Sequence, residues 1–530
     1  MSKLRWYGCL GVGLFMVACG ANETDSLRNT APYPNDTGGS GGYEGPAGGG
    51  QAGSGQLPPE QEVESAYESP VATGRFVWIA NPLSGRVAFI DAVTLEVSTT
   101  EAGNGPSYLA PVPHPSEDVA VVINEVSSDA TVLRATASDT IDSISLPIAQ
   151  QNNAWAISST GRWAIAWTDS RKIAEANETH GFQDIAVLDL SEGAEKATRL
   201  SVGYRPVALQ FSADEMHAYA VTQDGISVMD LSTGNPVIVG LIPVSDDPFD
   251  DPASRDVSIT ADGMYALVRW ENSDRIVVVS LENGMRTEVN LSGTVTDLDL
   301  SSDGKKAIAV IREQGEVAVL PIPGIVEAPT AYETVKITNM VVGSATMASE
   351  AQVALLYSNA SQQDRIAALH YENSPATSDA IKLHAPVLAA FLAPTGISSI
   401  VLHPPTNSLE SSYVSAFSVL HLSPKLPAKI VGMTAPPSAV AISPSGEYGV
   451  VAERDDAKKV FGAYLIKMFN QQVDRFELAS PPIAVGTLAE AKRAYVAQKH
   501  PEGRITFVDL ETGLIRTLTG FELGARVVNP

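Results

Sequence analysis

The stretch "GRVAFIDAVTLEV" (85–97) decides the fold, because close variants of it return later in the chain. They are "DIAVLDLSEG" (184–193), "DGISVMDLSTG" (224–234) and "GRITFVDLETG" (503–513). In each, apolar residues lead up to an aspartate, and small or polar residues follow. This is the pattern of a half-buried β-strand that runs into a turn. The phrase is therefore one unit of a repeat.

Ten copies of this strand occupy the chain from about residue 75 onward. They centre near Asp91, Leu133, Leu188, Met229, Val279, Leu320, Leu369, Leu420, Ile466 and Val508. Between them lie paired apolar stretches joined by a turn, such as "DVSITADGMYALV" (256–268), where Gly263 permits a tight hairpin. Four short strands in each period of roughly 45 residues is the pattern of a β-propeller blade. The sequence predicts an all-β propeller of about ten four-stranded blades.

We favour one closed ring. Two smaller propellers are the alternative, because ten blades exceed the usual range of roughly four to eight. The first unit shows no innermost strand, whereas the chain finishes on "ELGARVVNP" (522–530), which has the pattern of a lone strand. We expect this C-terminal strand to complete the first blade and so to join the two ends of the ring.

Two longer phrases carry a family resemblance. "RFVWIANPLSGRVAFIDAVTLEV" (75–97) resembles the strand–Asn–strand–Asp phrase of the YVTN family of bacterial β-propellers, which are relatives of the lactonase-like and WD40-like folds. "PSAVAISPSGEYGVVAE" (437–453) resembles the Pro–apolar–Ser-Pro-x-Gly phrase of that family. The resemblance covers nearly all of 75–530. It implies a propeller whose ligands meet the face built by the loops between strands two and three and between successive blades.

The N-terminus has the pattern of a secretory signal. Lys3 and Arg5 precede an apolar run too short to span a membrane, and the run ends in "MVACG" (16–20). This ending resembles a bacterial lipobox, which implies that residues 1–18 are a lipoprotein signal peptide and that Cys19 is lipidated. By the same resemblance, Gly20 favours the outer membrane. The expected localisation is a lipid anchor in the bacterial cell envelope, on the periplasmic or surface face.

The sequence predicts three regions: the signal peptide (1–18), a linker (19–73) and the propeller (74–530). We expect residues 19–73 to be a flexible linker, because their composition, rich in Gly, Ser, Pro and Glu, does not bury enough apolar surface to fold. Residues 74–530 form the propeller. The two cysteines, Cys9 and Cys19, both lie near the N-terminus, so no disulfide is expected in the folded part.

The net charge of −26 narrows the possible partners. A strongly acidic protein repels phosphate backbones, so nucleic acid is not expected as a partner. Direct adsorption of the folded part onto anionic lipid is disfavoured for the same reason. The membrane contact that we expect is the one made by the N-terminal lipid.

Candidate binding residues come from loops that are longer than the repeat requires, because function concentrates in such loops. These loops span 168–184, 403–415 and 453–462, and their candidate residues are His180, Asp184, His403, Tyr413, Asp455 and Asp456. We expect His180 and His403 to be solvent-facing or turn residues unless they approach each other across the ring. No catalytic residue can be assigned.

A fourth loop, 245–256, is dense in carboxylates. Oxygen clusters suit Ca²⁺, which gives a weak candidate calcium site. It comprises Asp246, Asp247, Asp250 and Asp251, with Asp256 beside them. The spacing does not match an EF-hand, so a solvated acidic loop is the favoured interpretation. No other cofactor is expected. For the repeated aspartates Asp91, Asp189, Asp230 and Asp509 we expect a structural role in bracing the following turn.

Two functions follow from this pattern. The first is an envelope-anchored lipoprotein whose propeller acts as a binding or scaffolding module for a protein or glycan partner. The alternative is a periplasmic or surface enzyme of lactonase-like or quinoprotein type, which rests on analogy of fold alone.

Overall fold

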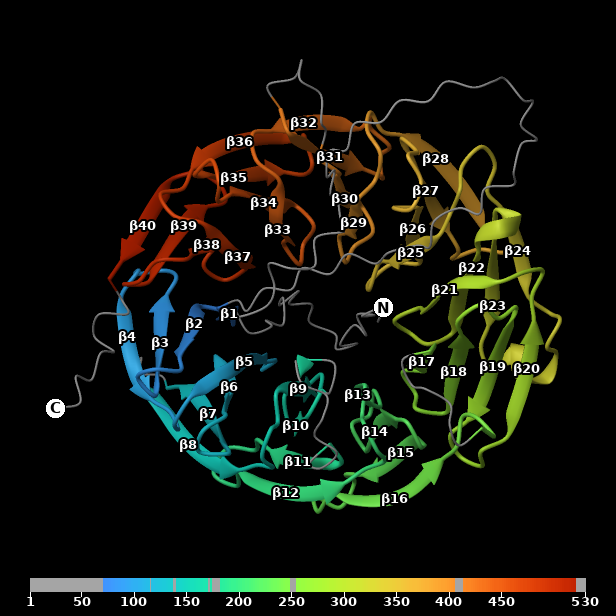
Figure 1. Cartoon of the computed structure of the whole chain (residues 1–530), viewed down its shortest axis with the longest axis horizontal. Coiled ribbons are helices and arrows are strands. Elements are labelled where there is room, and N and C mark those ends of the chain that lie inside the picture. The colour runs from blue at the N-terminus through green and yellow to red at the C-terminus, as the bar shows by residue number, and fades with distance from the viewer. Residues whose placement is uncertain are drawn as a thin grey trace, which may run out of the picture.

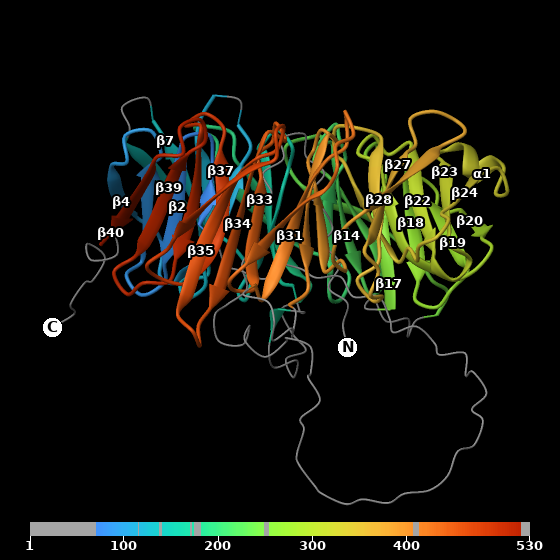
Figure 2. The ribbon, with the colours of Figure 1, turned by 90° about the horizontal axis from the view of Figure 1, so that it is seen from above.

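The computed structural model describes residues 70–114, 116–136, 140–169, 172–173, 182–247, 254–405 and 413–520. These residues form ten four-stranded antiparallel sheets, each built from four strands that follow one another in the chain. Figure 1 shows the sheets arranged as blades around one ring, and Figure 2 shows that the ring is a single layer of blades. The prediction of a propeller of about ten blades in one closed ring is confirmed.

The blades are numbered here in chain order. Blades 1 to 5 comprise β1 (Val71–Ala72), β2 (Phe76–Asn81), β3 (Arg86–Asp91), β4 (Val97–Glu101); β5 (Pro106–Val112), β6 (Val119–Asn124), β7 (Asp129–Ala135), β8 (Ile141–Pro147); β9 (Ala154–Ile157), β10 (Trp163–Trp167), β11 (Asp184–Asp189), β12 (Lys196–Ser201); β13 (Ala208–Phe211), β14 (His217–Thr222), β15 (Gly225–Asp230), β16 (Val237–Ile242); β17 (Arg255–Ile259), β18 (Tyr265–Trp270), β19 (Arg275–Ser280) and β20 (Arg286–Asn290).

Blades 6 to 10 comprise β21 (Val295–Leu300), β22 (Lys306–Ile311), β23 (Glu316–Pro321), β24 (Glu333–Lys336); β25 (Ser344–Met347), β26 (Val353–Tyr357), β27 (Arg365–His370), β28 (Thr377–Lys382); β29 (Ala389–Leu392), β30 (Ser398–His403), β31 (Ser415–His421), β32 (Lys429–Met433); β33 (Pro437–Ile442), β34 (Tyr448–Asp455), β35 (Val460–Lys467), β36 (Gln472–Glu477); β37 (Pro482–Leu488), β38 (Arg493–Gln498), β39 (Arg504–Asp509) and β40 (Ile515–Thr519). The described residues also include a short α-helix, α1 (Gly324–Glu327), between β23 and β24, and a 3-10 helix (Arg312–Gln314) between β22 and β23. No helix in these described ranges is both long enough and apolar enough to cross a membrane.

The structure places each repeat unit in the register that the sequence predicts. All ten predicted centres lie on the third strand of their blades, from Asp91 on β3 to Val508 on β39. The four aspartates that close these strands brace turns as expected. The Asp91 carboxylate, for example, accepts the backbone N–H of Val93 at 2.7 Å, and the Asp230 carboxylate accepts that of Ser232 at 2.8 Å.

The core is divided into clusters that lie between neighbouring blades rather than at the centre of the ring. The second and third strands of a blade are buried on both faces, as in β6 and β30, where every residue is buried. One face packs on the preceding blade and the other on the following blade. Blades 2 and 3, for instance, share a cluster that contains Val121 and Leu188. Burial of this apolar surface holds the ring together.

The ring closes differently from our expectation. Blade 1 takes its innermost strand from β1, which pairs with β2 through Val71↔Trp78 and Ala72↔Val77. The prediction that 522–530 supplies this strand is therefore wrong for blade 1, and that segment lies outside the described residues. A strand of two residues is too short to show alternation in a sequence, which is why it escaped notice. Blades 1 and 10 meet through side-chain packing that includes Val77 and Phe507.

Candidate functional site

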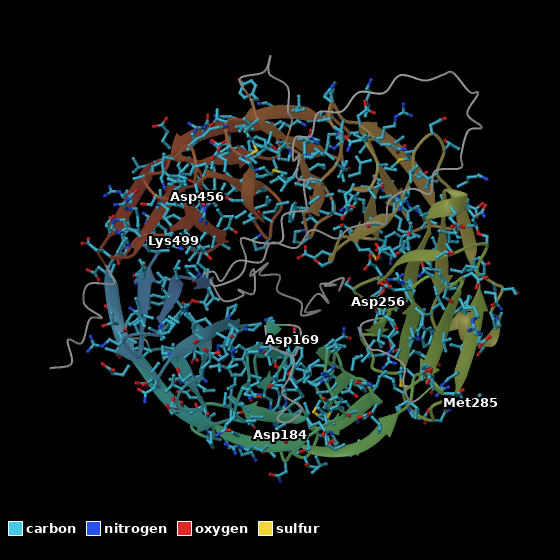
Figure 3. All side chains as sticks on the ribbon, viewed as in Figure 1. Asp169, Asp184, Asp256, Met285, Asp456 and Lys499 are labelled. Carbon is cyan, nitrogen blue, oxygen red and sulfur yellow. The ribbon has the colours of Figure 1, made fainter. Side chains whose placement is uncertain are left out.

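The predicted site residues share one face of the ring. Because the strands of each blade alternate in direction, the loops between second and third strands emerge on the same face as the connections to the next blade. Asp184 begins β11, His403 ends β30 and Asp455 ends β34, so all three lie at this face. They are far apart around it, since Figure 3 shows Asp184 at the bottom of the ring and Asp456 at its upper left. The structure does not bring them into one site.

Asp184 lies in a groove between blades 2 and 3 with a volume of about 880 Å³. Strands β7 and β8, the connection between the blades, and strands β11 and β12 supply its walls. The lining residues are Ser127, Ser128, Asp129, Ser145, Leu146, Pro147, Ala149, Gln150, Gln151, Asp184, Arg199, Leu200 and Ser201. Hydroxyl, amide, carboxylate and guanidinium groups thus converge on one hollow, beside the buried side chains of Leu146 and Ala149.

The polar groups of the groove are held in place by short contacts. The hydroxyl of Ser201 donates to the Asp184 carboxylate at 3.0 Å, and the Ser127 hydroxyl donates to the Asp129 carboxylate. Arg199 donates one N–H to the carbonyl oxygen of Ile148 across the blade interface. Among the described residues, no carboxylate forms an ion pair with Arg199, so its remaining donors are available to a bound ligand.

A second feature of the same face is the hairpin that joins β34 and β35. Each of these strands has eight residues, and Figure 2 shows their hairpin extending past the neighbouring blades. Asp455 accepts the backbone N–H of Lys458 at 3.0 Å, and this bond, with the Lys458 charge, holds the pKa of Asp455 below its usual range. Asp456 accepts from Arg454 Nε at 2.8 Å. These charges are therefore paired within the hairpin.

His403 is a buried structural residue and not the solvent-facing or turn residue that we expected. Its exposed fraction is 1%. Nδ1 lies 2.6 Å from the carbonyl oxygen of Pro386, and Nε2 lies 2.7 Å from the Ser418 hydroxyl. A carbonyl only accepts, so Nδ1 carries the proton and Nε2 accepts from Ser418. Burial lowers the pKa of His403 and keeps the ring neutral.

The position of His403 recurs in other blades with other residue types. In each case a polar side chain near the end of the second strand bonds a hydroxyl on the third strand, on the residue two positions after its direct pairing partner. The equivalent pairs are Asn124 with Thr131 at 2.9 Å, Gln498 with Thr506 at 2.7 Å and Glu453 with Tyr464 at 3.0 Å. His403 belongs to this set of internal ties, which fix the ends of the two central strands against each other.

The other predicted positions are exposed or undescribed. Tyr413 is half exposed, and its ring lies on the backbone of Gly432, where an added Cβ would be 2.5 Å from Tyr413 Cγ. His180 lies outside the described residues, and so do Asp250 and Asp251.

Two carboxylates in the described part of the acidic loop are paired with arginines. Asp246 accepts from the Arg286 guanidinium at 2.7 Å, and Asp256 is paired with the buried Arg269. No group of three or more His, Cys, Asp or Glu residues able to hold a metal ion occurs within the described ranges. The calcium site stays a prediction.

Sequence reasoning missed most of the groove. Ser145 and Arg199 lie on β8 and β12, the outermost strands of two different blades. Nothing in either strand marks it as part of a hollow, because the hollow exists only where two blades stand next to each other. The length of the 168–184 loop was the one available signal, and it pointed to Asp184.

Comparison with known proteins supports the fold. No protein-family model matches the chain, and no curated protein matches it. A solved structure of a eukaryotic initiation factor matches with a TM-score of 0.51 and 11% identity, over 78% of this chain and 96% of that one. Dihydro-heme d1 dehydrogenase NirN in complex with DHE matches with a TM-score of 0.40 and 12% identity, over 88% of this chain and 76% of that one. Kuenenia stuttgartiensis hydrazine synthase matches with a TM-score of 0.33 and 13% identity, over 59% of this chain and 95% of that one. The first of these likenesses supports the propeller fold and says nothing about function.

Proposed function

We propose that this protein is an envelope-anchored lipoprotein of YVTN type whose propeller binds a protein or glycan partner. The observation that carries the proposal is the groove between blades 2 and 3, the hollow in which a predicted site residue, Asp184, lies with other polar groups. A rigid ring presents such a groove without rearrangement, which reduces the entropy cost of binding.

The chemistry of the groove favours a polar ligand. Its hydroxyl and amide groups, on residues such as Ser145 and Gln150, match the hydroxyls of a glycan or the backbone of an extended peptide. Arg199 adds a fork of donors suited to a carboxylate. The adjoining carboxylates disfavour a strongly acidic ligand. Within the described residues no specific observation favours the enzyme alternative.

In-cell crosslinking tests the binding proposal. A photo-crosslinking amino acid replaces Gln150 in the groove, and the matched control replaces Gln472 on β36, the outermost strand of blade 9. We expect a partner to be captured from position 150 and not from position 472, and we expect Arg199→Ala to reduce its yield. Equal capture from both positions, or capture that Arg199→Ala leaves unchanged, would contradict a role for the groove.

The anchor is tested separately. Cys19→Ser should move the protein from the membrane fraction to the soluble fraction and abolish incorporation of labelled palmitate, because the thiol that would carry the lipid is gone. A Cys9→Ser variant is the matched control and should behave as wild type. Membrane association that survives Cys19→Ser would refute lipidation at this residue.

A further inference from the structure

The outer wall of the ring contains one strand unlike the other nine. Strand β16, "VIVGLI" (237–242), carries no charged residue. Each of the other nine outermost strands carries at least one charged residue. Examples are Glu101 on β4, Asp142 on β8, Lys196 on β12, Arg286 on β20, Glu333 on β24, Asp379 on β28, Lys429 on β32, Asp474 on β36 and Arg516 on β40. Charges on edge strands are a known means of preventing association. The ring therefore protects nine edges and leaves β16 without this protection.

The side chains of β16 form an apolar patch. Val237, Ile238, Val239 and Leu241 have exposed fractions of 46%, 37%, 56% and 48%. The strand contains a bulge: Met229 pairs with Ile238 and Val228 with Gly240, which leaves Val239 without a partner residue. We call the surface formed by these four residues and Met285 the β16 patch.

Met285 extends the patch along the rim. It belongs to the turn between β19 and β20, its exposed fraction is 69%, and Figure 3 shows it at the outer edge of the ring. A Cβ added to the neighbouring Gly284 would lie 3.9 Å from Ile242 Cγ2, at the end of β16. Exposed apolar side chains that gather on one part of a protein surface are typical of an interaction site.

We propose that the β16 patch is the contact through which two copies of this chain associate about a two-fold axis. An uncharged apolar patch is complementary to itself, so one surface serves both copies. The bulge interrupts a regular backbone edge, so the contact consists of side-chain packing rather than of a continuous sheet. Since only one edge of ten lacks charge, the assembly stops at a dimer.

The charges at the two ends of β16 fit this arrangement. Lys196 binds the Asn235 side chain at 3.0 Å just before the strand begins. Asp246 lies shortly after the strand ends. It is paired with Arg286 of the same chain at 2.7 Å, but its side chain is 95% exposed, so a second cation can still reach its carboxylate. Antiparallel contact about a two-fold axis brings the start of one strand to the end of the other, so Lys196 of each copy approaches Asp246 of its partner copy. Asp230, near the start of β16, is already bonded to the backbone N–H of Ser232.

The patch is small, and this sets the expected affinity. Standard interfaces bury about 800 Å² on each partner, which is more than five side chains supply. The net charge of −26 also opposes association. We expect a dimer with a dissociation constant on the order of 10 μM.

Sedimentation equilibrium of the full chain carrying Cys19→Ser tests the proposal, since no lipid then contributes. The chain should show a monomer–dimer equilibrium, and Leu241→Lys should weaken it at least tenfold. The added lysine makes the net charge less negative, so general repulsion cannot explain the loss. The matched control is Val97→Lys, which makes the same change from an exposed apolar residue on β4 and should leave the equilibrium unchanged.

A charge exchange tests the antiparallel geometry. Lys196→Asp alone and Asp246→Lys alone should each weaken the dimer, and the double variant should restore it. A chain that is monomeric at all concentrations, or one that Leu241→Lys does not affect, would overturn the proposal. A polymer in place of a dimer, or a different protein retained at the patch while the chain stays monomeric, would also overturn it. The result is independent of groove binding, because none of Lys196, Leu241 and Asp246 lines the groove.

Discussion

The hydroxyl of Tyr495 donates a hydrogen bond to the carbonyl oxygen of Pro70 at 2.8 Å, which ties blade 10 to the chain just before blade 1. These residues are 425 positions apart. Tyr495 is buried, and burial raises the pKa of its hydroxyl, so the group stays a donor. In the described chain this bond lies at the one blade interface across which no peptide bond runs.

We expect Tyr495→Phe to weaken this seam. Loss of one buried hydrogen bond costs roughly 1 kcal/mol and leaves the Pro70 carbonyl without its donor. The matched control is Tyr219→Phe, because Tyr219 donates to the Gly263 carbonyl at 3.0 Å between blades 4 and 5. Hydrogen exchange should rise across blades 1 and 10 in the first variant and only near blades 4 and 5 in the second. Equal and local effects would show that the seam is no weaker than other interfaces.

Glu215 should stabilise the interface between blades 3 and 4 in a pH-dependent way. It occupies a turn position that holds glycine in several other blades, and its φ is +55°. Its carboxylate accepts from the Thr160 backbone N–H at 2.6 Å and from the hydroxyls of Thr160 and Ser159 at 2.7 and 2.8 Å. Burial opposes the charge, but these bonds hold the pKa of Glu215 below its usual range.

We expect Glu215→Gly to lower the thermal midpoint even though glycine relieves the positive φ. Relief is worth about 1–2 kcal/mol, whereas bonds to a charged group contribute roughly 1.5–3 kcal/mol each. A lowered pKa gives stability that is present above the unfolded pKa and is lost as the pH falls through the folded pKa. The difference between wild type and variant should therefore shrink below about pH 4.5. A variant as stable as wild type at neutral pH would contradict this account.

His403 should make the protein sensitive to mild acid. Its pKa is lowered by burial, so the unfolded state binds a proton more readily than the folded state. Stability is then lost as the pH falls from about 6.5 through the folded pKa. His403→Gln, which copies the residue at the same position in blade 10, should keep the bond to Ser418 and remove this loss. His370→Gln makes the same substitution at a partly exposed position and is the comparison for the effect of replacing a histidine by glutamine.

Filling the groove should block partner capture without unfolding the ring. Ser145→Trp places a large side chain in the groove, and Ser143→Trp places it two residues away on β8, outside the lining. We expect crosslinking from position 150 to fall at least tenfold in the first variant only, with thermal midpoints within about 2 °C of wild type in both, since exposed substitutions change stability little. Unchanged capture in Ser145→Trp would place the partner elsewhere.

Much of the fold could be predicted because each blade repeats a local pattern. The centres from Asp91 to Val508 all lie on third strands, since alternation and turn residues are properties of a few neighbouring residues. The site could be predicted only in part. Asp184 lies in the groove, but Arg199 was not anticipated, because a groove between blades joins segments that no local pattern links. His403 was misjudged because its partner on β31 is visible only in three dimensions.

The sequence by itself determined the number of blades, the position of each third strand and the turns braced by aspartates, because these depend on contacts within one blade. Tertiary structure alone decided how the ring closes, with Val71 and Ala72 as the innermost strand of blade 1, and which polar residues meet in the groove. It also decided that the uncharged strand β16 lies on the outer wall. The physical reason is that packing between blades brings together residues far apart in the chain, and no periodicity along the chain encodes which of them will meet.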